Sequence, residues 1–209
     1  MRLALFGGTF DPIHRGHMAI ARAAADEFAL DRLLVAPAGR QPLKPEGSTA
    51  PFADRLAMVA LACRDQRDPR FEPSGIDAPL PGHAPNFTVD TLVELAARHP
   101  GAQLFALAGA DSFSSLASWH APYRLIQLAE WIVFSRPGFA LSYPPGLELT
   151  ATQRARIHLL NSVHEDVAAT HLRSRLAAPS VPPDPCADLL APSVAQYIQQ
   201  HGLYRASAS

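Results

Sequence analysis

Residues 3–17 read LALFGGTFDPIHRGH, and the architecture can be worked out from them. The apolar run Leu3–Phe6 stops at Gly7-Gly8, which is typical of a short buried strand followed by a sharp turn. Beyond the turn, small and apolar residues recur at helical spacing through Gly16–Leu30. A strand, a glycine turn and a helix in this order predict the first unit of an α/β protein.

The rest of the chain continues this alternation. Apolar runs predict further strands at Leu33–Ala36, Phe71–Ile76, Gln103–Ala108, Trp131–Ser135 and Ile157–Ser162. Helical spacing predicts helices at Pro51–Cys63, Thr88–His99, Pro122–Leu128, Thr150–Arg156, Thr170–Ala177 and Pro192–His201, with Thr88 and Thr170 as capping residues. We therefore expect a Rossmann-like α/β fold with a parallel sheet and helices on both faces. We expect one domain over residues 1–209, with its core at about 2–205.

Composition narrows the classes of partner. The chain has 209 residues, of which 48% are hydrophobic and 18% charged, and its net charge is -1. Because no global positive field results, we expect neither a nucleic-acid nor a membrane partner. Cys63 and Cys186 are too few for a disulfide framework or a zinc ribbon. No signal peptide or membrane span is recognisable, so we expect a cytoplasmic protein. The oligomeric state stays open, with a homo-oligomer among the options.

The turn after the first strand has the features of an anion-binding site. Gly7 and Gly8 let the backbone approach a ligand closely, and the helix that follows points its positive end at the same place. His14 and His17 are three residues apart, so both imidazoles can reach one site and donate hydrogen bonds to phosphate oxygens. The pattern is neither a Walker A loop nor G-x-G-x-x-G. A tight turn with two surface histidines is the competing interpretation of the turn alone.

The whole string resembles a known signature. G-G-[ST]-F-D-P-x-H-x-G-H is similar to that of the nucleotidyltransferase superfamily, and from Leu3 to Arg205 the chain resembles the bacterial nicotinate-nucleotide adenylyltransferases. The resemblance implies transfer of the adenylyl group of ATP to nicotinate mononucleotide, without a covalent intermediate, giving deamido-NAD and pyrophosphate. Mg²⁺ is expected with the ATP. The resemblance implies catalytic roles for His14, His17 and Arg173, and ATP binding by Gly7, Gly8, Thr9, Phe10, His14, His17, Gly109, Asp111, Thr170 and Arg173.

Two of these assignments have plain structural alternatives. Arg173 lies early in a predicted helix, where a cation is unfavourable unless an anion joins it. It resembles the arginine of the superfamily's late [ST]-x-x-[IL]-R pattern, although Ala168 stands where the nicotinate-specific family has serine; a solvated helix face is the alternative. Asp111 follows a buried strand, where a carboxylate can bind ribose hydroxyls or simply cap a helix.

Other segments bear on the acceptor. In the family that the chain resembles, segments similar to Asn86-Phe87-Thr88 and Ser118-Trp119-His120 bind the pyridine ring. Thr88 and the backbone near His120 would bind the carboxylate, and Trp119 would stack on the ring, although core filling is its ordinary role. The resemblance assigns acceptor binding to Gly8, Thr9, Lys44, Thr88, Trp119, His120 and Arg136.

Three other interpretations remain open. The chain could be a sister transferase that uses nicotinamide mononucleotide or phosphopantetheine. It could be a nucleotide-binding regulator that has lost catalysis, since Leu43 and Ala168 depart from the family pattern. Asp11, His14 and His17 could instead form a metal-hydrolase site, although zinc usually needs three protein ligands in fixed geometry.

Overall fold

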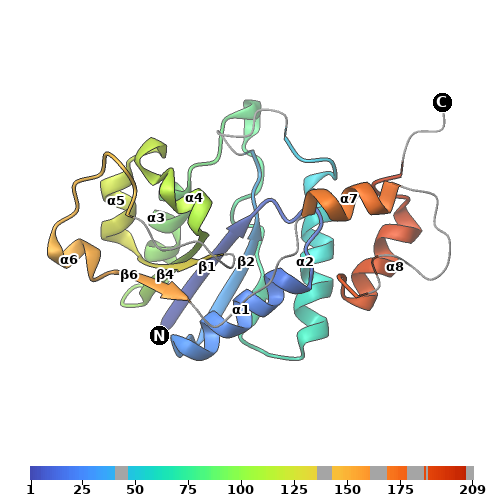
Figure 1. The fold of residues 1–209 in the computed structure, drawn as a ribbon, viewed down its shortest axis with the longest axis horizontal. Helices are drawn as coiled ribbons and strands as arrows, with labels where there is room; N and C mark the ends of the chain where they lie inside the picture. The colour runs from blue at the N-terminus through green and yellow to red at the C-terminus, as the bar shows by residue number, and fades with distance from the viewer. Residues whose placement is uncertain (41–46, 136–142, 161–168, 178–185, 187, 206–209) are drawn as a thin grey trace.

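The structure, a computed structural model, describes residues 1–40, 47–135, 143–160, 169–177, 186 and 188–205. Their strands form a six-stranded sheet in the order β3-β2-β1-β4-β5-β6 (Figure 1). The strands are β1 (Arg2–Gly8), β2 (Arg32–Pro37), β3 (Phe71–Pro73), β4 (Gln103–Gly109), β5 (Glu130–Phe134) and β6 (Ile157–Leu160). Every neighbouring pair is parallel. The predicted fold class is therefore confirmed, and the strand order is the doubly wound order of dinucleotide-binding folds.

Helices cover both faces of the sheet (Figure 1). The apolar cluster on one face includes residues of α1 (Arg15–Glu27), α2 (Phe52–Gln66), α7 (Ala169–Ala177) and α8 (Pro192–His201), and α8 packs on α2. The other face packs on α3 (Thr88–Arg98), α4 (Ala110–Ser114) and α5 (Pro122–Leu128). The short elements are α6 (Ala151–Arg154) and the 3₁₀ turns η1 (Pro81–His83) and η2 (Leu116–Ser118).

The apolar runs of the sequence explain why the core has two layers. Successive side chains of a strand point to opposite faces, so Ala4 and Phe6 of β1 join the α1–α2 layer while Leu3 and Leu5 join the α3–α5 layer. All of these side chains are buried. Strands that are covered on both sides need apolar residues at consecutive positions, which is the pattern that parallel sheets carry.

Several predicted boundaries and caps were wrong. Phe87, not Thr88, is the capping residue of α3, and Thr88 is its first helical residue. Helix α7 includes Ala169, so Thr170 lies in its first turn rather than capping it. The third strand ends at Pro73, short of the predicted Ile76, although the Ser74 N–H still donates to the Val35 carbonyl over 3.0 Å. Helix α4 was not among the predicted helices; it begins directly after Gly109, so Asp111 lies in its first turn and Gly109 is the capping residue.

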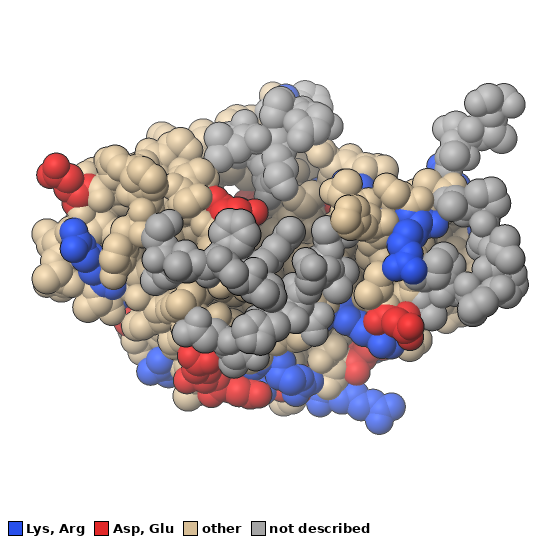
Figure 2. Space-filling view, in the orientation of Figure 1, with Lys and Arg blue, Asp and Glu red and all other residues tan. Residues whose placement is uncertain are grey.

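The strand order reverses between β1 and β4, which are hydrogen-bonded neighbours with their crossovers on opposite faces. Ligands of such sheets bind beyond the carboxyl ends of the strands at this switch point. Acidic and basic side chains both occur on the face that Figure 2 shows, in line with the net charge of -1. No helix among the described residues is long and apolar enough to cross a membrane.

Candidate active site

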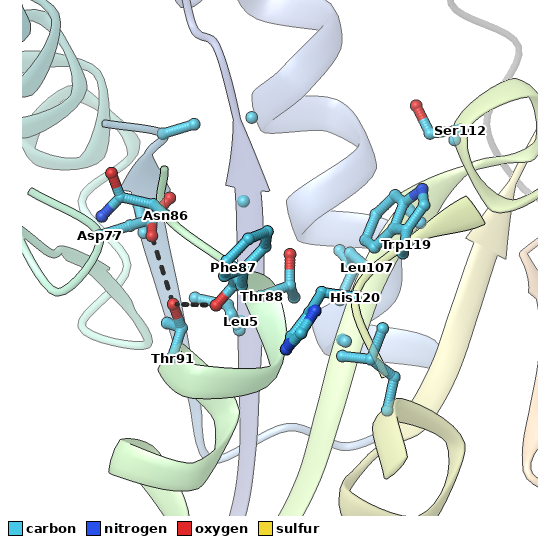
Figure 3. A pocket seen from close by; sticks show the side chains of 18 of the residues that line it. Leu5, Asp77, Asn86, Phe87, Thr88, Thr91, Leu107, Ser112, Trp119 and His120 are labelled. Carbon is cyan, nitrogen blue, oxygen red and sulfur yellow. Dashed lines mark hydrogen bonds between the residues drawn. The ribbon is translucent and has the colours of Figure 1, made fainter. Parts of the chain in front are cut away.

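A cavity of about 310 Å³ opens at the carboxyl ends of β1, β2 and β4, at the switch point. Seven residues that the sequence analysis singled out line it, namely Gly7, Gly8, Thr9, Thr88, Gly109, Trp119 and His120. They come from the β1 turn, the start of α3, the end of β4 and the segment after η2. Figure 3 shows Trp119 and His120 on one side of this cavity and Asp77 and Asn86 on the other. The structure therefore brings residues from distant parts of the sequence to one site.

Residues 7–17, which we call the histidine turn, continue from this cavity to the start of α1. His14 is the capping residue of α1, and its backbone N–H donates to Nδ1 of His17 over 3.3 Å. The two imidazoles stack with their ring centres 3.6 Å apart. The His17 ring also meets the edge of Phe10 at 5.0 Å. The predicted pair thus lies together at the helix N-terminus, and the interpretation as two surface histidines was wrong for His14, which is buried.

Burial sets the charge of both imidazoles. It lowers the pKa of His14 to about 4. It also lowers the pKa of His17 well below the ordinary value, and a positive charge on His14 would lower it further. Both rings are therefore neutral near pH 7. Because Nδ1 of His17 accepts a hydrogen bond, its proton lies on Nε2, which makes that nitrogen a donor. Two neutral donors and a helix N-terminus suit an anion.

Thr88, Trp119 and His120 form what we call the ring end of the cavity. His120 is exposed and stacks on Phe87 with ring centres 4.4 Å apart. The Trp119 indole N–H donates to the Ser115 hydroxyl over 3.2 Å, and the ring meets Trp131 edge-on at 6.0 Å. The hydrogen bond to Ser115 and the contact with Trp131 therefore fix the orientation of the indole, which lines the cavity.

Asn86 and Asp77 lie on the opposite side of the cavity (Figure 3), and no role was predicted for Asp77 from the sequence. The carbonyl oxygen of the Asn86 side chain accepts from the backbone N–H of Arg40 over 3.0 Å. The backbone N–H of Asn86 donates to the Arg40 carbonyl, also over 3.0 Å. Asp77 accepts from the Thr91 hydroxyl over 3.2 Å (Figure 3). Burial raises the pKa of the Asp77 carboxyl to about 6 against the effect of its hydrogen bonds. Its sequence context, a carboxylate soon after a weak strand, is too common to have identified it.

The residues predicted to bind ATP elsewhere lie on two further elements. The Arg173 guanidinium of α7 donates to the backbone carbonyl of Asp11 over 2.8 Å and approaches the Thr170 hydroxyl at 3.4 Å. Arg173 is thus brought to the histidine turn. Asp111 lies exposed in the first turn of α4, where a Cβ on Gly109 would come within 2.6 Å of its Oδ1. A side chain at position 109 would therefore require this carboxylate to move. Lys44 and Arg136, as well as Leu43 and Ala168, lie outside the described residues.

The carboxylate that the metal-hydrolase interpretation requires, that of Asp11, is already hydrogen-bonded within the protein. Asp11 is 3% exposed, and its oxygens accept from the backbone of Thr49 and Ala50 and from the Tyr204 hydroxyl. Within the part of the chain that the structure describes, no three His, Cys, Asp or Glu side chains are grouped to hold a metal ion. A cation that arrives on a triphosphate fits this site better, since Mg²⁺ is usually bound through substrate phosphates and few protein oxygens.

The fold and this site together define a class of protein, the nucleotide-binding α/β proteins, because a ligand cavity lies at the switch point beside a helix terminus suited to phosphate. Comparison with known proteins agrees. The cytidylyltransferase-like family model matches residues 5–175. A relative from Solibacter usitatus named "Probable nicotinate-nucleotide adenylyltransferase" is 38% identical, with 98% of this chain and 100% of the relative aligned. One of the same name from Roseiflexus is 39% identical, with 97% and 98% aligned.

Solved structures show the same fold. The nicotinic acid mononucleotide adenylyltransferase of Plasmodium falciparum, complexed with NaAD, has a TM-score of 0.73 at 16% identity, with 97% of each chain covered. Its complex with APC has a TM-score of 0.71, with 97% of this chain and 96% of that chain covered. The chain belongs to the cytidylyltransferase-like family and, within it, to the nicotinate-nucleotide adenylyltransferases.

Proposed function

We propose that the protein transfers the adenylyl group of ATP to the phosphate of nicotinate mononucleotide and releases pyrophosphate, a step of NAD biosynthesis. One observation supports this most strongly. Gly8 and Thr9 belong to the histidine turn and also line the cavity that Thr88 and Trp119 close. A triphosphate on the turn and a pyridine nucleotide in the cavity would therefore meet at these two residues.

The triphosphate lies along the histidine turn in this proposal. His14 and His17 donate to its oxygens, and Arg173 of α7 faces it from the other side. The adenosine ribose lies near Asp111 at the end of β4. The acceptor ring occupies the ring end of the cavity, where Trp119 stacks on it and Thr88 takes its carboxylate. Lys44 stays a predicted phosphate ligand, and Arg136 a predicted acceptor-binding residue whose partner is either a phosphate or a carboxylate.

The chemistry needs positioning and charge stabilisation rather than a base. A nucleotide phosphate is already ionised near pH 7, so it can attack the α-phosphorus of ATP in line. The bond from the α-phosphorus to its bridging oxygen breaks, and pyrophosphate leaves with the electron pair. The neutral imidazoles and Arg173 stabilise the charge that builds up on the leaving group. Mg²⁺ bound to the triphosphate would neutralise part of that charge.

Other features of the sequence interpretation remain predictions. They are the extent of one domain over residues 1–209, a cytoplasmic location, and the choice of Mg²⁺ among divalent ions. The oligomeric state remains open, a homo-oligomer included.

An acceptor panel tests the proposal. Pyrophosphate release from ATP is measured with nicotinate mononucleotide, nicotinamide mononucleotide and phosphopantetheine at equal concentration. We expect the fastest release with nicotinate mononucleotide, because N–H and O–H donors at Thr88 suit a carboxylate. Faster release with either of the other acceptors would identify a sister transferase. ATP binding without release with any acceptor would identify a regulator.

A further inference from the structure

The histidine turn contains a buried carboxylate, Asp11, and both of its oxygens accept hydrogen bonds from other parts of the protein. Asp11 Oδ2 accepts from the Thr49 N–H over 2.6 Å, and Oδ1 accepts from the Ala50 N–H over 3.0 Å. The Tyr204 hydroxyl donates to the same Oδ1 over 2.7 Å. Tyr204 follows α8 near the end of the chain, 193 residues from Asp11. Asp11 therefore joins three separate segments.

A buried cation completes this arrangement. Arg55 is 2% exposed, and its Nη1 donates to the backbone carbonyls of Thr9 over 2.7 Å and Ala38 over 2.8 Å. Its Nε donates to the Ala50 carbonyl over 3.2 Å. Burial lowers the pKa of Arg55, and the negative charge of Asp11 opposes this. A buried charge is tolerated when it is hydrogen-bonded and near an opposite charge; Arg55 donates to three carbonyls and is stabilised by the charge of Asp11. We call Asp11, Arg55 and Tyr204 the anchor network.

The anchor network acts on backbone that faces the substrates. Thr9, which Arg55 holds, lines the cavity, and so does Ala38. Asp11 also offers its backbone carbonyl to Arg173 of α7. None of the three side chains of the network lines the cavity, so we expect it to act through the backbone that it holds.

We propose that Tyr204 is a positioning residue for nucleotidyl transfer, acting through Asp11 on the shape of the histidine turn. This inference rests on the proposed function. The alternative is that Tyr204 only fastens the end of the chain. In that case its hydrogen bond supports stability but leaves the rate of the chemical step unchanged.

The chain contains a matched control. The Tyr197 hydroxyl of α8 donates to Asp54 of α2 over 2.8 Å, so it too joins the late part of the chain to a carboxylate. Neither Tyr197 nor Asp54 lines the cavity. Tyr204→Phe and Tyr197→Phe each remove one hydroxyl and leave the ring. They differ in whether the lost bond reaches the histidine turn.

The first test compares the two variants by kcat, KM and Tm. We expect Tyr204→Phe to lower kcat roughly 10-fold, less than the 10²-fold that a 1 Å misplacement can cause, with little change in KM for nicotinate mononucleotide. We expect the kcat of Tyr197→Phe to stay within about 2-fold of the wild-type value, even if its Tm falls as much as that of Tyr204→Phe. Unchanged kcat in Tyr204→Phe, or an equal fall in both variants, would overturn the inference.

Hydrogen exchange of the protein without substrates gives a second readout. Tyr204→Phe should speed exchange of the backbone amides of residues 7–17, whereas Tyr197→Phe should leave them as in the wild type. Unchanged exchange there in Tyr204→Phe would contradict the inference. If Tyr204→Phe fails to fold, Asp11→Asn, which keeps the side-chain size, is compared in its place.

The two proposals fail in different ways. A wild-type protein that releases no pyrophosphate with any mononucleotide would refute the proposed function. The exchange comparison would still decide whether Tyr204 sets the shape of the turn.

Discussion

The histidine turn and the ring end of the cavity lie on the same edge of the sheet, yet they offer different contacts. The turn has a buried His14, and both of its imidazoles are neutral because they are desolvated. The ring end has an exposed imidazole stacked on Phe87 and a tryptophan held at its edge. The first region is suited to stabilising charge that changes during a reaction. The second is suited to selecting a flat ring and its carboxylate.

This difference predicts which kinetic constant each region controls. Interactions that strengthen in the transition state raise kcat, whereas contacts that bind substrate and transition state equally lower KM. Substitutions in the turn should therefore act mainly on kcat, and those in the ring end mainly on KM for the acceptor.

The largest expected effect is that of His17→Ala. Loss of one preorganised donor to the leaving group should lower kcat by about 10²-fold or more. Steady-state pyrophosphate release at saturating ATP measures it. Near-normal turnover would remove the histidine turn from the chemistry.

The next effect is the dependence of the free energy of unfolding on pH, which His14 should cause. In the unfolded chain His14 has an ordinary pKa of 6.5, while in the folded protein it is about 4. Between these values the unfolded state binds more protons, so stability is full above pH 6.5 and falls as the pH drops towards 4. We expect this group to contribute a loss of about 3 kcal/mol over that range, from the size of the shift.

Urea unfolding at several pH values measures this loss. His14→Gln should weaken the dependence and leave the part that His17 contributes, while His201→Gln, at the exposed end of α8, should keep all of it. An unchanged slope in His14→Gln would show that His14 is not desolvated in the folded protein.

A smaller effect is expected at Trp119. Trp119→Ala should raise KM for nicotinate mononucleotide roughly 10-fold, the scale of losing a stacking partner for one base, with little change in kcat. Initial rates against acceptor concentration test this. A fall in kcat with unchanged KM would contradict this prediction, because it would mean that Trp119 stabilises the transition state rather than binding the acceptor.

The smallest effect concerns selectivity. Thr88→Val keeps the shape of the side chain but loses its hydroxyl, a hydrogen bond worth about 1 kcal/mol. We expect the preference for nicotinate over nicotinamide mononucleotide to fall roughly 5-fold. The ratio of the two kcat/KM values measures it, and an unchanged ratio would move the carboxylate away from Thr88.

Much of this arrangement could be predicted because it depends on local patterns. The apolar runs and glycine turns predicted the parallel α/β fold, and the spacing of His14 and His17 predicted that they lie together. The resemblance added Thr88, Trp119 and His120, which line one cavity as expected.

The rest depends on contacts between distant segments. Arg55 and Tyr204 occur in ordinary helical and terminal sequence, and their partners are backbone carbonyls or a carboxylate far along the chain. No spacing rule connects such groups. The Thr88 cap was wrong because a hydroxyl at the start of a helical pattern fits either the cap or the first turn, and in the structure Phe87 is the cap.

The central claim is that the two regions bind different substrates. Hydrogen exchange of the wild-type protein tests it, with a non-hydrolysable ATP analogue and with nicotinate mononucleotide added separately. We predict that the analogue protects residues 7–17 and the start of α7, and that the mononucleotide protects residues 86–91 and 115–120. Protection of the same segments by both ligands, or the reverse assignment, would contradict the account.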